Sequence, residues 1–290
     1  MTYSVLILCD SITRNGIRLT TMQVTMPRFI LAEFNTHRML SRNSASSRAI
    51  PLSKRIQEVV QNPFVPEAFA TNQKGMQAGA ELNENDQKAA REIWLKASRI
   101  ACEQALQLSE VGVHKQWNSR ILEPYLWQPV VVTATDWDNF FNLRIHKDAQ
   151  PEIKKVAELM KKALFESTPN MLHDGEWHTP YITAQDIDES CNNPTCTVDE
   201  KWLAKLSTAR CARVSYNTHG ANKRDIEADI ALHDRLVESG HMSPTEHIAM
   251  VNESLMDGAP YTPAYCGNFR LPWQQYRKMI VNEKVFKESK

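Results

Sequence analysis

The stretch that decides how the rest of the chain is read is NTHRMLSRNSASSR, residues 35–48. Its fourteen residues hold three arginines, one histidine, five hydroxyl side chains and two amides, and no acid. Arginine forks pair bidentately with phosphate, and hydroxyl groups complete the shell around an oxyanion, so the composition favours an anion site. A second interpretation fits the same spacing: a basic helix C-terminus that complements the helix dipole, followed by serines that cap the next turn.

The flanking segments predict a mixture of strands and helices. Strands are predicted at 5–8 and 17–26, joined by a turn at Asn15-Gly16. Residues 129–135 predict a short buried strand or an apolar lead-in to the next helix. Helices are predicted at 27–34, starting with Pro27, and at 85–111, 136–144, 149–165 and 225–239. The fold class that follows is α+β, with a mixed sheet and long helices.

Helical periodicity predicts the buried faces of three of these helices. In the helix at 85–111 the apolar period runs through Ala90, Ile93, Trp94, Ala97, Ile100, Ala101, Ala105 and Leu108. In the helix at 149–165 it runs through Ile153, Val156, Ala157, Met160 and Leu164. In the helix at 225–239, which Gly240 should stop, it runs through Ile226, Ile230, Leu236 and Val237.

Composition excludes several classes of function. The 290 residues hold 34 basic and 34 acidic side chains, so a protein that coats nucleic acid, which needs a basic excess, is not expected. No apolar run approaches the ~20 residues needed to span a bilayer, and the N-terminus lacks the features of a signal peptide. Six cysteines without framework spacing fit reduced thiols. We therefore expect a cytoplasmic protein.

Three further stretches could carry chemistry or organisation. In 240–247, Ser243, Pro244 and Glu246 match a capping box, and a helix N-terminus there could also bind phosphate. Arg144 follows an apolar run, so it needs either a buried anionic or carbonyl partner or a surface salt bridge to Asp148 or Glu152.

Residues 184–200 are acidic and polar and predict a linker or surface excursion. Within them Cys191 and Cys196 bracket four residues, a spacing wider than zinc pairs usually show, and no second pair follows. No metal site is predicted. There is no Gly-rich phosphate loop, so a dinucleotide would not be held by a Rossmann turn.

Five blocks of the chain together resemble the signature of the flavin-dependent thymidylate synthases. His37, Arg38 and Ser46 match the R-H-R triplet and the serine that follows it, although Thr36 replaces the first arginine. The other blocks are Arg120 to Pro124, Asn142 to Ile153, Ala212 to Tyr216 and Gly240 to His247. In the usual member the last two blocks precede the triplet. The resemblance therefore implies a single circularly permuted domain over 1–290, with the signature half at about 1–180 and the permuted block at about 202–280.

The resemblance implies a specific reaction. The family makes dTMP from dUMP, with methylenetetrahydrofolate as carbon donor and with NADPH-reduced FAD as the source of hydride. Its members are homotetramers with active sites shared between subunits, and they use no cysteine nucleophile. A permuted chain should bring strand 17–26 and the helix at 27–34 beside the segment that follows His247.

Roles for individual residues also follow from the resemblance. Arg144 and His241 would be catalytic; Arg144 would bind the pyrimidine and favour its N3-deprotonated form, because a fixed cation lowers the pKa of the group it faces. The nucleotide phosphate would be held by Ser46, Ser47, Arg48 and Arg120, and the nucleotide would also contact Glu33 and Ser44. The FAD site would be lined by Thr36, His37, Arg38, Asn139, Ser215, His241, Ser243 and Glu246, with His241 near the flavin and the folate.

Departures from the family pattern leave alternatives open. An arginine is usual at Thr36, an acid at Ser44, an amide at Glu33, a tyrosine at Ala49, and Asn and Arg at Thr133 and Thr135. Because a glutamate can accept from an exocyclic amine, dCMP is an alternative substrate, giving a methylated or hydroxymethylated pyrimidine. A non-catalytic nucleotide-binding protein and a purely structural role for the arginines are the remaining interpretations.

Overall fold

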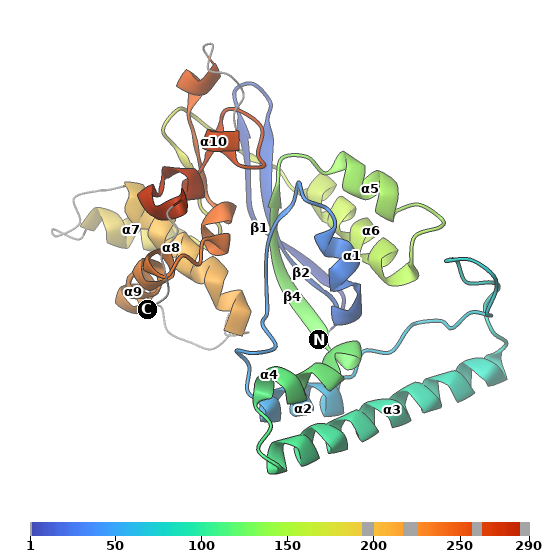
Figure 1. The fold of residues 1–290 in the computed structure, drawn as a ribbon. Coiled ribbons are helices and arrows are strands. Elements are labelled where there is room, and N and C mark those ends of the chain that lie inside the picture. The colour runs from blue at the N-terminus through green and yellow to red at the C-terminus, as the bar shows by residue number, and fades with distance from the viewer. Residues whose placement is uncertain (1, 193–199, 217–224, 257–262, 285–290) are drawn as a thin grey trace.

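The computed structural model describes residues 2–192, 200–216, 225–256 and 263–284. It is an α+β fold with two sheets (Figure 1). The larger sheet has the order β3-β4-β2-β1-β5, in which β1 and β5 run parallel and the other pairs antiparallel. Its strands are β1 (Ser4–Thr13), β2 (Arg18–Pro27), β3 (Ser41–Ser44), β4 (Trp127–Ala134) and β5 (Asn170–Leu172). The smaller, antiparallel sheet contains β6 (Trp177–His178), β7 (Ala249–Val251) and β8 (Trp273–Gln275).

Helices surround both sheets. The α-helices are α1 (Leu31–Asn35), α2 (Leu52–Gln61), α3 (Glu84–Glu110), α4 (Lys115–Asn118), α5 (Asp138–Arg144), α6 (Pro151–Glu166), α7 (Ala184–Asn192), α8 (Glu200–Arg213), α9 (Ile226–Glu238) and α10 (Pro263–Cys266). The 3-10 helices are η1 (Arg28–Ile30), η2 (Ser119–Tyr125), η3 (Val214–Tyr216), η4 (Ser243–His247), η5 (Glu253–Met256), η6 (Tyr276–Met279) and η7 (Val281–Lys284). Among the residues described, no helix is both long and apolar enough to cross a membrane.

The large sheet is covered on both faces. Alternation along β4 sends Val130 and Val132 to one face, where they share a core cluster with α5 and α6, and Val131 to the other, where α8 packs. Figure 1 shows α5 and α6 on one side of the strands and α8 on the other. The predicted inward face of the helix at 149–165 is confirmed, because all five of its predicted residues are buried. The predicted strands and the turn, in which Gly16 has a φ of 76°, are confirmed as well.

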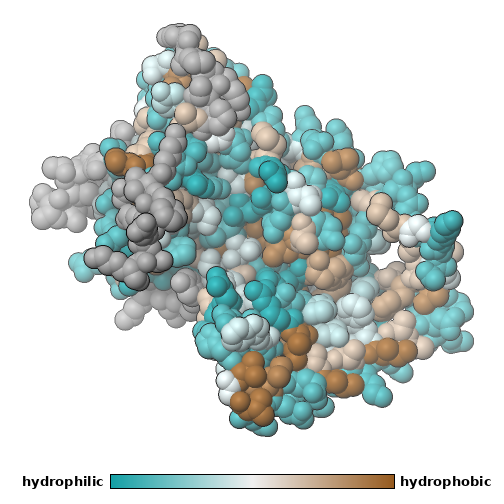
Figure 2. Space-filling view, in the orientation of Figure 1, coloured by the Kyte–Doolittle hydropathy of each residue, from teal (hydrophilic) through white to brown (hydrophobic). Residues whose placement is uncertain are grey.

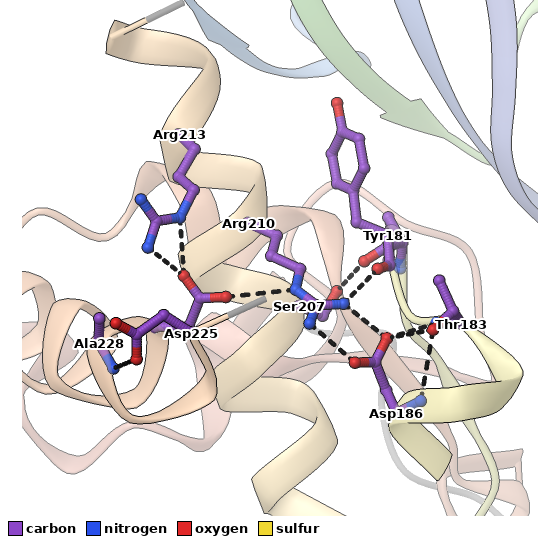
Figure 3. A network of polar contacts seen from close by, with 10 residues as sticks. Tyr181, Thr183, Asp186, Ser207, Arg210, Arg213, Asp225 and Ala228 are labelled. Atoms are coloured by element: carbon purple, nitrogen blue, oxygen red, sulfur yellow. Dashed lines mark hydrogen bonds and ion pairs between the residues drawn. The ribbon is translucent and has the colours of Figure 1, made fainter. Parts of the chain in front are cut away.

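The prediction of a linker at 184–200 is wrong for its first half. Residues 184–192 form α7, because the buried carboxylate of Asp186 receives hydrogen bonds from Thr183 and a bidentate pair from Arg210 at 2.6 and 2.8 Å (Figure 3). Arg210 and Arg213 of α8 also pair with Asp229 of α9. One of the acids that suggested a solvated segment, Asp186, is therefore the buried partner of an arginine. Residue 196 and the side chain of residue 191 lie outside the described part, and with them the cysteine pair.

Two other predicted faces are wrong in part. In α9 the fully buried residues are Asp229 and His233, while the predicted apolar side chains are only half-buried. In α3 the buried residues are Ser98, Cys102 and Ala105, which face α2 and η2, whereas Ile93 and Ile100 are 69% and 46% exposed. Helix α3 lies along one edge of the molecule (Figure 1), so only one of its sides is covered by the chain itself.

Candidate functional site

Arg144, the last residue of α5, reaches the segment that opened the sequence analysis. Its Nε donates to Nε2 of His37 at 2.7 Å, and one terminal nitrogen donates to Oγ1 of Thr36 at 3.2 Å and the Glu33 carbonyl at 3.4 Å. The predicted carbonyl partner is therefore present. The surface salt bridge is not, because Asp148 faces His146 and Arg144 forms no ion pair with any described residue. The guanidinium charge thus has no counter-ion among the described residues.

His37 is held as a neutral imidazole. The His37 side chain is buried, and the centroids of the His37 and Phe140 rings lie 4.9 Å apart in a T-shaped arrangement. Arg42 donates to the His37 backbone carbonyl. Burial lowers the pKa of His37 to about 4, and the charges of Arg144 and Arg42 contribute to this shift. Because Nε2 accepts a hydrogen bond from Arg144, the ring proton is assigned to Nδ1. His37 therefore orients the guanidinium without adding charge.

A second polar cluster forms around Glu123. Its Oε1 accepts from Oγ of Ser47 at 2.7 Å and from Arg120 at 2.8 Å, and it pairs with Arg28 at 3.0 Å. Burial alone would raise the pKa of Glu123, but the hydrogen bond from Ser47 and the charge of Arg28 hold it below the usual range. Beside this cluster lies a cavity of about 500 Å³, lined by Arg28, Phe29, Leu31, Ala32, Asn35, Arg120, Glu123 and Pro124.

The signature stretch meets the C-terminal block directly. The backbone N–H of Ser46 donates to the Ser215 carbonyl, and the Asn43 side chain donates to the Cys211 carbonyl, both at 2.9 Å. The predicted contact of β2 with the segment after His247 is confirmed at one end, where Leu19 shares a core cluster with Ala249 and Val251. The helix after Pro27 lies at the opposite end of β2.

The prediction of a capping box in 240–247 is wrong. Ser243 is the first residue of η4, its N-cap is Met242, and no side chain caps that end. The Glu246 carboxylate instead pairs with Arg277, because η4 packs against η6 and not against free solvent.

The His247 side chain is fully buried. Its Nδ1 bonds to Thr133 at 2.8 Å, at the start of a buried chain of hydrogen bonds through Thr21 to His178. This chain gives Thr133, one of the departures from the family pattern, a structural role.

Several residues predicted to bind the cofactor have exposed polar groups without a hydrogen-bond partner among the described residues. Arg38, Asn139, His241 and Ser243 are exposed, and their side chains form no hydrogen bond or ion pair with any described residue. Ser44 is half-buried at the end of β3, and Arg48 is exposed. Arg42 lies between the Arg144 cluster and the C-terminal block. It donates to the His37 carbonyl, and the charge of Glu246 partly offsets the lowering of the Arg42 pKa by burial. A guanidinium, an amide, an imidazole and a hydroxyl without partners suit a ligand with phosphate and hydroxyl groups, so these residues fit FAD chemically.

Sequence reasoning missed several charged residues near these clusters, namely Arg28, Arg55, Glu123 and Arg277. Glu123 could have been found, because it stands three residues after Arg120 inside a block already singled out. Arg28 and Arg277 carried no such signal, because their partners, Glu123 and Glu246, are distant in the sequence.

The family model described as thymidylate synthase complementing protein matches residues 19–170. No curated protein sequence matches the chain. Among solved structures, those of a UMP/dUMP methylase, PolB from Streptomyces cacaoi, bound with 5-Br dUMP and with 5-Br UMP, have TM-scores of 0.45 and 0.46. They are 18% and 19% identical to this chain, and the likeness covers 56% of this chain and 89% and 88% of theirs.

Proposed function

The chain belongs to the family of the thymidylate synthase complementing protein, and on this premise we propose that it is a flavin-dependent thymidylate synthase that methylates dUMP to dTMP. One observation carries the proposal. Arg144, from α5, and His37, from the signature stretch, are 107 residues apart in sequence, yet Arg144 Nε lies 2.7 Å from His37 Nε2, and the guanidinium has no counter-ion within the described part of the chain. A pyrimidine ring that loses its N3 proton is an anion that suits this cation.

Arg144 would bind the pyrimidine base and polarise it. A fixed guanidinium facing N3 and a neighbouring carbonyl oxygen lowers the pKa of N3–H and pushes electron density toward C5, the carbon that must attack. His37 keeps the guanidinium in one plane by accepting from its Nε, while Nη2 donates to Thr36 and to the Glu33 carbonyl. Nη1 has no partner among the described residues and would donate to the ligand. The carbon would come from methylenetetrahydrofolate.

FAD, reduced by NADPH, would supply the hydride. The residues that would hold it are Thr36, His37, Arg38, Asn139, Ser215, Ser243 and Glu246, with His241 near the flavin and the folate. Four of these eight side chains, those of Arg38, Asn139, His241 and Ser243, are exposed and have no partner among the described residues. This supports an open site that a ligand completes. Phosphate binding would fall to Ser46, Ser47, Arg48 and Arg120, and Ser44 would contact the nucleotide.

A cytosine nucleotide is the second candidate substrate, and one observation favours it. Oε2 of Glu33 is buried and accepts no hydrogen bond within the described part of the chain. A buried carboxylate oxygen without a donor is unfavourable, and the exocyclic amine of dCMP would supply that donor. Glu33 lies on α1 beside the groups that hold Arg144.

We also propose that the domain is circularly permuted and works as a cytoplasmic homotetramer with shared active sites. The bond from Ser46 to Ser215 supports the permutation, because it joins the signature stretch to a block that follows it here and precedes it in the usual member. The exposed, unpartnered cofactor residues support a site that a second subunit helps to enclose.

The proposal is tested by a visible absorption spectrum of the purified protein, followed by anaerobic titration with NADPH in the presence of dUMP or of dCMP. A flavin band that bleaches faster with dUMP is the expected result. Faster bleaching with dCMP, together with labelled product from labelled methylenetetrahydrofolate, would move the substrate to cytosine. A protein that stays colourless after FAD is added would contradict the redox function and leave a nucleotide-binding protein.

A further inference from the structure

Two arginines in the region of Glu123 have N–H groups with no acceptor among the residues that the structure describes. Arg55 of α2 has no exposed surface, yet only one terminal nitrogen is used, in a 2.8 Å bond to Glu58; its Nε and its other terminal nitrogen are buried without a partner. Arg28 bonds to Gln128 at 2.6 Å and pairs with Glu123, while its Nε is buried without a partner. Because buried N–H groups of a cation are seldom left unpaired, these donors point to a missing anion.

Positive charge exceeds negative charge at this place. Burial lowers the pKa of Arg28, Glu123 raises it, and the nearby charges of Arg55 and Arg120 lower it again. Three guanidinium groups therefore share one region with the carboxylates of Glu58 and Glu123. The cavity of about 500 Å³ reaches this region through Arg28 and Arg120, which both line it.

The cavity lies on the same short helical segment as the Arg144 cluster. Arg28, Leu31, Ala32 and Asn35 line the cavity, a spacing that puts them on one face of η1 and α1. Glu33 and Thr36, which contact Arg144, follow Ala32 and Asn35 directly and so occupy the adjacent face. A base held at Arg144 and a phosphate held at Arg28 and Arg120 would flank one turn of helix, a span that suits a single nucleotide.

We propose that this cavity binds the 5′-phosphate of the nucleotide. Arg28 and Arg55 supply positive charge that attracts the phosphate, and Glu123 sets the affinity of the cavity for it. The inference rests on the proposed function and deepens it. Without ligand, the Glu123 carboxylate takes the hydrogen bonds of Ser47 and Arg120, two groups assigned to the phosphate. The incoming phosphate competes with this internal anion, so Glu123 keeps the donors in place and weakens binding of the dianion.

The test is direct binding of dUMP, deoxyuridine and inorganic phosphate by calorimetry, in the whole protein. Glu123→Gln keeps the shape and an acceptor oxygen but removes the competing charge, so it should tighten dUMP about tenfold and leave deoxyuridine unchanged. Arg28→Met should weaken dUMP about tenfold or more. The two variants act in opposite directions, so loss of folding cannot imitate both results. Glu67→Gln, which breaks an exposed pair with Lys155, is the matched control and should change nothing.

The outcomes separate the two proposals. If the Kd of dUMP is the same in all three variants while Arg144→Ala abolishes binding, the phosphate assignment is wrong and the proposed function stands. If inorganic phosphate responds to Glu123→Gln and Arg28→Met but no pyrimidine nucleotide binds, the anion site stands and the proposed function fails. Absence of any binding by the protein or its variants would overturn both.

Discussion

The charge of Arg144 is the feature on which the proposed chemistry depends most. Replacing it with alanine removes the cation that faces the base, and losing a preorganised charged donor typically lowers kcat by about 10²–10³-fold. We expect kcat/KM for dUMP to fall at least a hundredfold in Arg144→Ala. Arg144→Lys should recover little, because one ammonium cannot bond His37 and the base in one plane.

Steady-state kinetics measure this effect, and circular dichroism checks the fold. Arg270→Ala serves as the control, since the Arg270 side chain is 59% exposed and faces Asp136 at 3.8 Å. An Arg144→Ala enzyme with near-normal kcat/KM would remove Arg144 from the reaction.

His178 and His247 predict how stability depends on pH. Both are fully buried, and burial lowers the pKa of each to about 3, below the ordinary value of 6.5. As the pH falls below 6.5, both histidines therefore bind a proton in the unfolded chain but stay neutral in the folded chain. The stabilisation is complete above pH 6.5 and is lost progressively toward pH 3, by about 1.4 kcal/mol per pH unit for each histidine.

Denaturant unfolding at pH 7 and pH 5 checks this prediction. Each histidine should account for about 2 kcal/mol of the free energy lost between the two values. His247→Gln removes one titrating group, so its loss should be smaller than that of the parent protein by about this amount. Equal losses in the two proteins would mean that His247 is not held neutral.

Residue-scale reasoning from the sequence singled out several residues of the candidate site and missed Glu123. His37 was singled out because it lies in a polar, basic stretch without acids, and Arg144 because it follows an apolar run. Arg120 gained its proposed role from the family resemblance. Sequence could not show that the partner of Ser47 and Arg120 is Glu123, since which carboxylate faces which arginine is decided by how η2 packs against the β3 loop.

At the scale of elements, the junction of α7, α8 and α9 depends on buried ion pairs. Asp186 has no exposed surface and receives four hydrogen bonds, two of them from Arg210 (Figure 3). Removing one member of a buried pair leaves the other charge uncompensated and costs about 3–5 kcal/mol. Asp229 still faces Arg210 at 3.3 Å, so we expect Asp186→Ala to lose about 3 kcal/mol of unfolding free energy, the lower end of that range.

Thermal or denaturant unfolding measures that loss. Glu166→Gln provides the comparison, because Lys162 and Glu166 are 69% and 66% exposed and 3.8 Å apart, a pair worth about 0–1 kcal/mol. If the two variants are equally stable, the Asp186 network does not hold α7 in place.

The same network explains which helices could be predicted. Helix α6 packs apolar residues on the sheet, so its 3.6-residue period reported its buried face correctly. Helix α9 buries Asp229 and His233 against arginines of α8 and Tyr276, and hydrophobic periodicity carries no signal for such polar burial. Helix α7 was taken for a linker for the same physical reason.

At the scale of the whole molecule, the sequence predicted the class and the contact between the two halves, but not how much of the surface the chain leaves uncovered. Val60, Ile93, Ile100 and Trp117, on α2, α3 and α4, are between 46% and 69% exposed. Figure 2 shows hydrophobic residues along the edge of the molecule that α3 forms. Exposed apolar surface of this kind marks an interaction site.

A second copy of the chain is the partner that fits this edge in the proposed homotetramer. Ile93 and Ile100 stand two turns apart, so an antiparallel pair of α3 helices places Ile93 of each copy against Ile100 of the other. Chain periodicity could report this apolar stripe, but it carries no information about what covers the stripe.

Ile93→Glu with Ile100→Glu puts four like charges into that contact, so we expect the assembly to dissociate at micromolar concentration while each chain stays folded. Light scattering coupled to size exclusion gives the mass, and circular dichroism checks the helix content. Met76→Glu is the control, because Met76 is fully exposed on a loop away from α3's apolar stripe. Flavin binding should fall with the assembly, since the proposed FAD residues are exposed in the single chain and need a second subunit to enclose the cofactor. A variant that dissociates yet keeps its flavin affinity would place the whole FAD site within one chain.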